Sequence, residues 1–287
     1  MRVVVTGCSS GIGLATALLL ARRGDQVAAG VRNPGAAEEL RDTVAAEQLP
    51  VEILTLDVDD RASVDAAVDR ALVALGGIDA LVNNAGISQL AAVEDLREAD
   101  LMALLQTNCL GPLRMSQAVI PIMRDQGAGH IVNVSSMNAQ AAFAFTGGYA
   151  ASKAALEALS EALALEVARF GISVAIVQPG VFDSAIAAKA LPRAASVAYA
   201  GEADRLDTNR DRAAEAAPPL DDAAAAIAAV LDDPRPPLRT PVGRDATGIL
   251  RRRRSMTDRD FFDWVRSLDP PGDGSPDHST PTTSGAP

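Results

Sequence analysis

The stretch Arg2-Val3-Val4-Val5-Thr6-Gly7-Cys8-Ser9-Ser10-Gly11-Ile12-Gly13 decides the expected fold. Its first five residues form a β-branched run that predicts a strand, and residues 12–23 have the apolar spacing of a helix. A glycine-rich turn between a strand and a helix lets the backbone approach a pyrophosphate, whose charge meets the free amides and positive dipole of the helix start. This setting predicts a dinucleotide site made by Gly7, Ser9, Ser10, Gly11, Ile12 and Gly13.

Strand-like and helix-like segments alternate from this turn to about residue 180. Further strands are expected at 26–31, 51–56, 79–83, 130–135 and 172–178, and helices within 36–48 and at 62–75, 101–123 and 149–170. Short apolar strands separated by helices are typical of a parallel sheet with right-handed crossovers. The expected fold class is therefore α/β: a single-domain, Rossmann-type doubly wound parallel sheet with helices on both faces, spanning residues 1–268.

The segments after residue 182 do not continue the alternation of strands and helices. Residues 183–219 are alanine-rich with mixed charge, which suits a helical substrate lid, and they precede an expected helix at 221–231 and an edge strand at 238–242. Four arginines at 251–254 precede a short amphipathic helix that contains Phe261 and Trp264. A solvated helix face or an acidic partner is a better explanation of this run than a binding patch. The tail, 269–287, has the composition of a disordered segment.

Composition excludes several classes of function. The chain has 287 residues and a net charge of −11, so it is a poor candidate for binding nucleic acid or an anionic membrane. Cys8 and Cys109 fit no metal-ligand spacing, and with only His130 and His278 as histidines no metal site is expected. No apolar run approaches the ~18 residues of a membrane span, and a reducing cytoplasm is the expected location.

The segment Tyr149-Ala150-Ala151-Ser152-Lys153 holds one of the two tyrosines and one of the two lysines of the chain. Four residues make about one helical turn, so both side chains lie on one helix face. A nearby positive charge favours the phenolate, and we expect Lys153 to lower the pKa of Tyr149. The pair could then transfer a proton near neutral pH.

The spacing T-G-x-x-x-G-x-G resembles that of the short-chain dehydrogenase/reductase family, and the resemblance runs from Val3 to about Val242. Each further matching stretch lies at the end of a predicted strand or on a predicted helix. These stretches are Asp57-Val58, Asn83-Asn84-Ala85-Gly86, Asn108, Ser135-Ser136, the Tyr149 to Lys153 segment and Pro179-Gly180. The amino-acid sequence of the glycine turn, together with Val31-Arg32, resembles that of the hydroxysteroid and retinol dehydrogenase branch.

The resemblance implies a catalytic set of Asn108, Ser136, Tyr149 and Lys153. Ser136 would hydrogen-bond the substrate oxygen, with Ser135 as the neighbouring alternative that the family spacing disfavours. Tyr149 would exchange the proton, and Lys153 would also bind the nicotinamide ribose. Asn108 would help to hold a water in a proton relay; without the family pattern, a polar residue satisfied inside a helix would be the preferred explanation.

The resemblance also implies how the cofactor is held. Asp57 and Val58 would lie beside the adenine, although Asp57 could instead cap the helix that follows. The adenosine ribose would lie close to Asn84, Ala85 and Gly86. The nicotinamide would be covered by the loop that contains Pro179, Gly180 and Ser184. Arg32 follows the second strand, at the position where a site that binds the ribose hydroxyls has an acid. Its positive charge can pair with a 2′-phosphate, which favours NADP(H) over NAD(H). An ordinary surface arginine is the alternative.

Three phenylalanines, Phe143, Phe145 and Phe182, fall near the expected pocket and would give it an apolar lining, although core packing explains them about as well. The expected activity is NADP-dependent reduction of a carbonyl, or oxidation of the matching alcohol, on a hydrophobic small molecule. The alternative is a non-catalytic NADP-binding regulatory protein. The family further implies a homo-oligomer, a dimer or tetramer, assembled through the helices at 101–123 and 149–170.

Overall fold

The computed structural model describes residues 1–182, 190–191, 196–199, 201–202, 205, 208 and 216–268. Ser184, most of the expected lid at 183–219 and the tail at 269–287 lie outside these residues, so the predictions made for them stay predictions.

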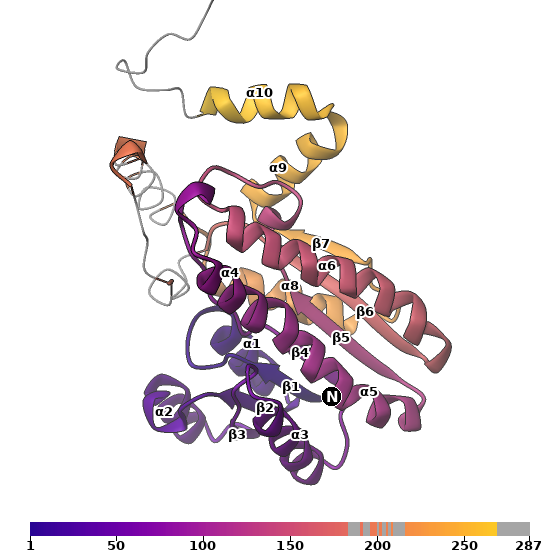
Figure 1. Ribbon diagram of the computed structural model, residues 1–287. Coiled ribbons are helices and arrows are strands. Elements are labelled where there is room, and N and C mark those ends of the chain that lie inside the picture. The colour runs from indigo at the N-terminus through magenta and orange to yellow at the C-terminus, as the bar shows by residue number, and fades with distance from the viewer. Residues whose placement is uncertain are drawn as a thin grey trace, which may run out of the picture.

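In the described residues, one seven-stranded sheet has every neighbouring pair of strands parallel (Figure 1). The strands are β1 (Arg2–Thr6), β2 (Gln26–Val31), β3 (Val51–Thr55), β4 (Ala80–Asn83), β5 (Gly129–Val134), β6 (Ile172–Pro179) and β7 (Arg239–Val242). Their order is β3-β2-β1-β4-β5-β6-β7, so the chain reverses direction across the sheet between β1 and β4. Ligands of open α/β sheets bind at this kind of switch point, outside the carboxyl ends of the strands.

Helices cover both faces of the sheet. They are α1 (Gly11–Arg22), α2 (Glu38–Glu47), α3 (Arg61–Leu75), α4 (Glu98–Leu105), α5 (Gly111–Gln126), α6 (Gly147–Val167), α8 (Leu220–Asp232), α9 (Arg244–Ser255) and α10 (Asp258–Leu268). One buried apolar cluster joins α1, α2 and α8 to the sheet, and a second joins α3, α5 and α6 to the other face. The predicted fold class, a single-domain doubly wound Rossmann-type sheet, is confirmed.

The predicted helix at 101–123 is the clearest difference from the sequence-based elements. It begins earlier, at Glu98, and a π-helical turn (Gln106–Leu110) divides it into α4 and α5. The Gly111 amide donates to the Gln106 carbonyl, a bond that spans five residues instead of four. Pro112 has no N–H, so the Asn108 carbonyl cannot receive its usual α-helical bond. The irregular turn therefore falls at a predicted site residue.

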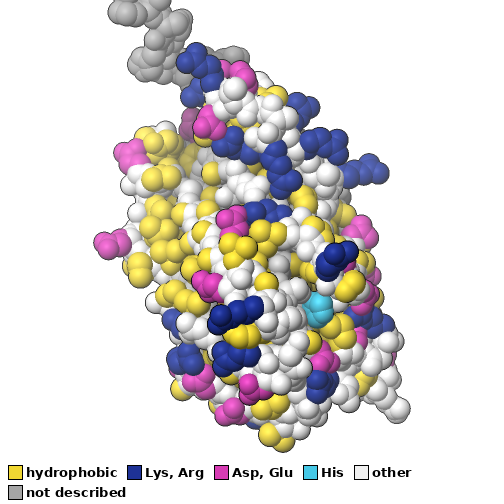
Figure 2. All heavy atoms as spheres, turned by 90° about the vertical axis from the view of Figure 1, so that its right-hand side faces the viewer, with side chains coloured by type: hydrophobic (Ala, Val, Ile, Leu, Met, Phe, Trp, Pro, Cys, Tyr) yellow, Lys and Arg dark blue, Asp and Glu magenta, His cyan; other side chains and the backbone are white. Residues whose placement is uncertain are grey.

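The C-terminal helices α9 and α10 extend from the end of the sheet next to β7 (Figure 1). Leu250 and Phe261 form a third small core with Ala141, which lies in the segment after β5. Arg252 lies over the Trp264 ring and Arg253 over Phe261, and Arg253 also pairs with Asp258 at 2.7 Å. The arginine run is thus largely a helix face that packs against α10, and arginines gather at this end of the surface (Figure 2).

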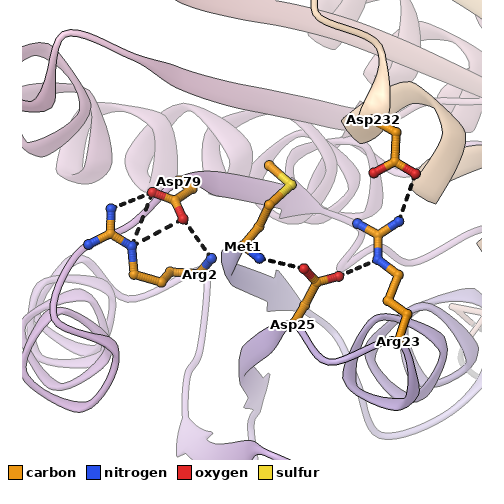
Figure 3. A network of polar contacts seen from close by, with 6 residues as sticks. All are labelled: Met1, Arg2, Arg23, Asp25, Asp79 and Asp232. Atoms are coloured by element: carbon orange, nitrogen blue, oxygen red, sulfur yellow. Dashed lines mark hydrogen bonds and ion pairs between the residues drawn. The ribbon is translucent and has the colours of Figure 1, made fainter.

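At the amino edge of the sheet, charged groups join the strand starts. Arg2 at the start of β1 donates from its backbone and its guanidinium to Asp79, just before β4. Asp25, just before β2, accepts from the Met1 amino group and from Arg23, which also reaches Asp232 on α8 (Figure 3). These ion pairs fasten the edge opposite to the predicted cofactor site.

Candidate active site

The predicted site residues come together at the carboxyl edge of the sheet. Gly7, Arg32, Asn84 and Ser136 each follow the end of a different strand within a few residues. Because all the strands are parallel, their carboxyl ends lie along a single edge. The fold therefore places the glycine turn and the catalytic candidates on the same side of the molecule.

The glycine turn is shaped for close approach. Gly7 has φ of +74° and Gly11 has φ of +64°, a region that favours glycine. A Cβ on Gly7 would lie 2.8 Å from Ala85 Cα, and one on Gly13 would lie 2.5 Å from the Gly7 carbonyl oxygen. The side chain of Ser10, the N-cap of α1, makes no capping hydrogen bond, and the first turn carries no acid. These residues fit a bound pyrophosphate.

Thr6 and Asn84 lock this turn to the segment after β4. The Thr6 hydroxyl oxygen accepts from the Asn84 and Ala85 amides, both at 3.0 Å. The Asn84 side chain in turn donates to the Thr6 carbonyl at 3.0 Å and to the Gly7 carbonyl at 3.4 Å. Asn84 therefore braces the glycine turn with its side chain, and Thr6 is a site residue that the sequence reasoning did not single out.

The residues expected to read the adenosine end lie after β2 and β3. Arg32 is exposed, and no carboxylate of the described residues forms an ion pair with it. Asp57 accepts from the Asp59 amide at 3.0 Å, whereas Asp60 caps α3 by accepting from the Ala62 amide at 3.0 Å. The helix-cap explanation of Asp57 is thereby removed. Val58 is buried beside it.

The two serines after β5 have different partners. The Ser135 hydroxyl donates to Glu157 on α6 at 2.8 Å and is buried. The Ser136 hydroxyl instead lowers the pKa of Tyr149 by hydrogen bonding, and its oxygen accepts from the Asn138 amide at 3.2 Å. Ser136 is thus the serine that faces the tyrosine.

Tyr149 and Lys153 lie on the first two turns of α6. Burial raises the pKa of Tyr149 to about 12, against the opposing effect of its hydrogen bond with Ser136. The prediction that Lys153 lowers this pKa is wrong: the groups that set it are the burial of the phenol and the hydrogen bond with Ser136. The Lys153 ammonium is directed to the Val134 carbonyl at 2.8 Å and lies 6.0 Å from the centre of the tyrosine ring. Tyr149 is therefore held as a protonated phenol at neutral pH.

Lys153 itself is almost fully buried. Burial lowers its pKa to about 8, while the negative charge of Glu157 acts in the opposite direction. Gly86 leaves the space beside it open, since a Cβ there would lie 3.6 Å from the Lys153 Nζ and 3.2 Å from the Asn108 Oδ1. The Lys153 ammonium, the Asn108 side-chain amide and Gly86 therefore lie close together at the carboxyl edge of the sheet.

Asn108 is fully buried in the π-helical turn. Its side chain exchanges two hydrogen bonds of 2.9 Å with the Ile87 backbone and donates to the Ser152 hydroxyl at 3.0 Å. These bonds tie α6 to the segment after β4. Both side-chain N–H donors are used, whereas Oδ1 accepts one bond, and Pro112 leaves the Asn108 backbone carbonyl without its α-helical partner.

The turn after β6 is held by β7 and by the start of α9. The Gly180 amide donates to the Val242 carbonyl at 2.9 Å, and the Val181 amide donates to Asp245 at the start of α9 at 2.7 Å. Phe182 is buried in the core that includes Ile227 and Val242. Of the two explanations for Phe182, the structure favours core packing over a pocket lining, because the residue is 7% exposed and belongs to this buried cluster.

The other two aromatic candidates lie between Ser136 and Tyr149. Phe143 packs partly against the α9–α10 core. Phe145 has φ of +64°, unusual for a residue with a side chain, and its carbonyl accepts from the Ala91 amide at 2.8 Å. Its ring meets that of Tyr199 edge to face at 5.9 Å. Tyr199 also donates to Glu94 at 2.8 Å, so described residues of the expected lid contact the rim of the site.

Comparison with known proteins decides the family. The short chain dehydrogenase family model matches residues 1–194. The chain belongs to the short-chain dehydrogenase/reductase family. It is 34% identical over 289 residues to retinol dehydrogenase 8 from Bos taurus, covering 93% of this chain and 92% of that protein. The resemblance to the hydroxysteroid and retinol dehydrogenase branch is confirmed, and the protein is an NAD(P)-dependent oxidoreductase.

Solved structures agree with this assignment. A short-chain dehydrogenase from Streptomyces avermitilis is 37% identical with a TM-score of 0.82, and the match covers 93% of this chain and 96% of that one. A short chain dehydrogenase/reductase from Burkholderia phymatum, solved in complex with NAD, is 26% identical with a TM-score of 0.77 over 88% of this chain and 91% of that one.

Proposed function

We propose that this protein is an NADP-dependent oxidoreductase that reduces a carbonyl to a secondary or primary alcohol, or catalyses the reverse, on a hydrophobic small molecule. The observation that carries the proposal is the placement of Ser136 after β5 beside Tyr149 on α6, whose pKa its hydroxyl lowers by hydrogen bonding, with Lys153 one turn further along α6. All three lie at the sheet edge that carries the glycine turn. A nicotinamide cofactor, when bound there, supplies the hydride.

In this proposal the protein supplies the proton and holds the oxygen. Ser136 donates a hydrogen bond to the substrate oxygen, where negative charge develops during reduction. Tyr149 then gives its proton to that oxygen, which it can do because its phenol stays protonated at neutral pH. Lys153, one turn further along α6, would hold the nicotinamide ribose, as the family resemblance implies. These groups suit carbonyl reduction at neutral pH better than alcohol oxidation, which needs the phenolate first.

Arg32 supports NADP(H) as the cofactor. It is exposed directly after β2, at the position where a site specific for ribose hydroxyls has an acid, and its guanidinium can pair with a 2′-phosphate. The Burkholderia relative was solved with NAD, so the family alone does not decide between the two cofactors.

The substrate class rests on the apolar rim. Phe143 and Phe145 lie between Ser136 and Tyr149 in the sequence, and the ring of Phe145 contacts Tyr199. A rim of this kind favours an apolar substrate. We further propose a homo-oligomer in the cytoplasm, assembled through the α4–α5 and α6 helices, on which Leu159 and Leu165 are exposed. Of the described helices, none is long and apolar enough to span a membrane.

A panel of aldehydes and ketones, from short-chain to retinoid- and steroid-sized, tests this function by the loss of NADPH absorbance, repeated with NADH. We expect turnover of apolar members with NADPH and slower turnover with NADH. Binding of NADPH without oxidation of any panel member would support the non-catalytic regulator instead. Faster turnover with NADH would overturn the cofactor assignment alone.

A further inference from the structure

A second polar cluster lies directly behind the catalytic groups, and the sequence reasoning did not single it out. Its centre is Glu157, which is 3% exposed and stands one helical turn after Lys153 on α6. Buried carboxylates cost free energy unless their charge and lone pairs are met by partners. The identity and origin of those partners indicate what this one does.

Four donors converge on the Glu157 carboxylate: two come from the segment between β5 and α6, one from β6 and one from β7. Oε1 accepts from the Ser135 hydroxyl and from the Gln178 amide, both at 2.8 Å. Oε2 accepts from the Gln140 amide at 3.3 Å and from the Arg239 guanidinium at 2.8 Å. Each oxygen thus receives two donors, which is the full capacity of a carboxylate.

These donors are neighbours of the candidate catalytic and cofactor residues. Ser135 precedes Ser136, and Gln178 precedes Pro179 and Gly180 at the end of β6. Gln140 lies in the segment between Ser136 and Tyr149. A single side chain on the catalytic helix therefore fixes the backbone on which the oxygen-binding serine and the nicotinamide-side turn lie.

The negative charge of Glu157 also acts on the pKa of Lys153. Residues four apart on a helix lie on the same face, and the carboxylate charge raises the pKa of Lys153 against burial, which lowers it to about 8. The other ionisable groups around this ammonium are Tyr149 on the same helix and Cys109 in the π-helical turn, and Arg239 reaches the carboxylate from β7. Glu157 is the acid of this set.

We propose that Glu157 is a positioning residue for the reduction, a proposal that rests on the function proposed above. Its carboxylate holds Ser135, and through it Ser136, against Tyr149, and it keeps the ammonium of Lys153 charged. A glutamine at 157 keeps the shape but has a single acceptor oxygen and no charge. Two of the four donors must then lose their acceptor.

The chain offers a direct readout, because Lys153 and Lys189 are its only lysines. Protein labelled with [13Cε]lysine gives two lysine signals, and K189R assigns them. We expect the Lys153 signal to titrate near pH 8 in the native protein, and about one pH unit lower in E157Q. This measurement needs neither substrate nor cofactor.

Glu161 is the matched control. It is the next acid on α6, it also pairs with Arg239, and its side chain is 52% exposed. E161Q should leave the Lys153 titration and the turnover number unchanged. For E157Q we expect the turnover number to fall by about 10- to 100-fold, with little change in KM and with the alkaline loss of activity moved to lower pH.

A second variant separates charge from geometry. S135A removes one donor and leaves the Glu157 charge in place, so it should lower the turnover number several-fold while Lys153 titrates as in the native protein. The proposal is overturned if Lys153 titrates alike in native protein and E157Q, or if a folded E157Q turns over at the native rate. Should E157Q not fold, unchanged turnover in S135A overturns the positioning of Ser136. If native protein reduces no carbonyl while E157Q still shifts the Lys153 titration, the proposed function fails and the electrostatic link stands.

Discussion

At the amino edge of the sheet Arg2 and Asp79 pair in contact with solvent, whereas at the carboxyl edge Glu157 and Lys153 are buried on one helix. The exposed pair joins β1 to the segment before β4 and involves no predicted site residue. The buried Glu157 carboxylate pairs with Arg239 and accepts from Ser135, the neighbour of Ser136. Partly exposed pairs contribute modest stability, whereas buried charges shift pKa values and restrict geometry. The comparison indicates that stability and chemistry are placed at opposite edges.

The largest effect on cofactor binding is expected from G13A. The new methyl group would lie 2.5 Å from the Gly7 carbonyl oxygen, so the glycine turn must shift. Forced rearrangements of this size cost about 1–3 kcal/mol, and we expect cofactor affinity to fall by about 10- to 100-fold or more. A fluorescence titration with NADPH measures it. The control is G248A, because nothing lies within 4 Å of a Cβ there; equal NADPH affinity in the two variants would contradict the assigned turn.

R32A should change which cofactor is preferred. Loss of a guanidinium pair with the 2′-phosphate should weaken NADPH binding by about 10- to 100-fold and leave NADH binding unchanged. R41A on α2 removes an exposed arginine of the same type and is the control. If R32A weakens both cofactors equally, or neither, Arg32 does not read the phosphate.

T6V tests the brace between the glycine turn and the segment after β4. Valine keeps the shape of threonine but leaves the Asn84 and Ala85 amides without their 3.0 Å acceptor. We expect a loss of about 1–3 kcal/mol of unfolding free energy and NADPH affinity roughly 10-fold lower. T6S keeps the hydroxyl and should behave like native protein in denaturant unfolding and NADPH titration. Native-like affinity in T6V would show that the brace does not shape the cofactor site.

The smallest effect on activity is expected at the amino edge. Arg2 lowers the pKa of Asp79 by hydrogen bonding, so the ionised carboxylate stabilises the fold above its unfolded pKa of about 3.9. D79N should therefore lose about 1–2 kcal/mol at pH 7, and the difference from native protein should vanish as the pH falls below the folded pKa.

The same variant should keep the native turnover number per folded molecule. D65N, which breaks the exposed Arg61–Asp65 pair on α3, is the control and should cost less stability. Denaturant unfolding at pH 7 and pH 3 measures the first point, and initial rates measure the second. A D79N protein that is as stable as native protein but slower would break the division between the edges.

Local patterns in the sequence were sufficient for the fold, because the β-branched runs and glycine stops fix each strand and the alternation fixes the parallel sheet. The predicted strand at 26–31 matches β2, and the predicted edge strand at 238–242 matches β7 within one residue. The π-helical turn was missed, although Pro112, four residues after Asn108, is a signal that could have indicated it.

The site was harder to predict where it depends on distant partners. The glycine turn and the Tyr149–Lys153 spacing are local and could be read directly. The direction of the Tyr149 pKa depends on burial, and Lys153 turns to the Val134 carbonyl, which no spacing rule reveals. Glu157 is visible as an acid four residues after Lys153, but its donors come from segments up to 82 residues away.

The central claim is that Tyr149 transfers the proton. Y149F removes only the hydroxyl, and the measurement is NADPH oxidation with a carbonyl that the native protein reduces, alongside NADPH binding to the same variant. We expect turnover to fall by about 10²- to 10⁴-fold while the NADPH dissociation constant stays within about threefold of the native value. A folded Y149F protein that binds NADPH and turns over at the native rate would contradict the account.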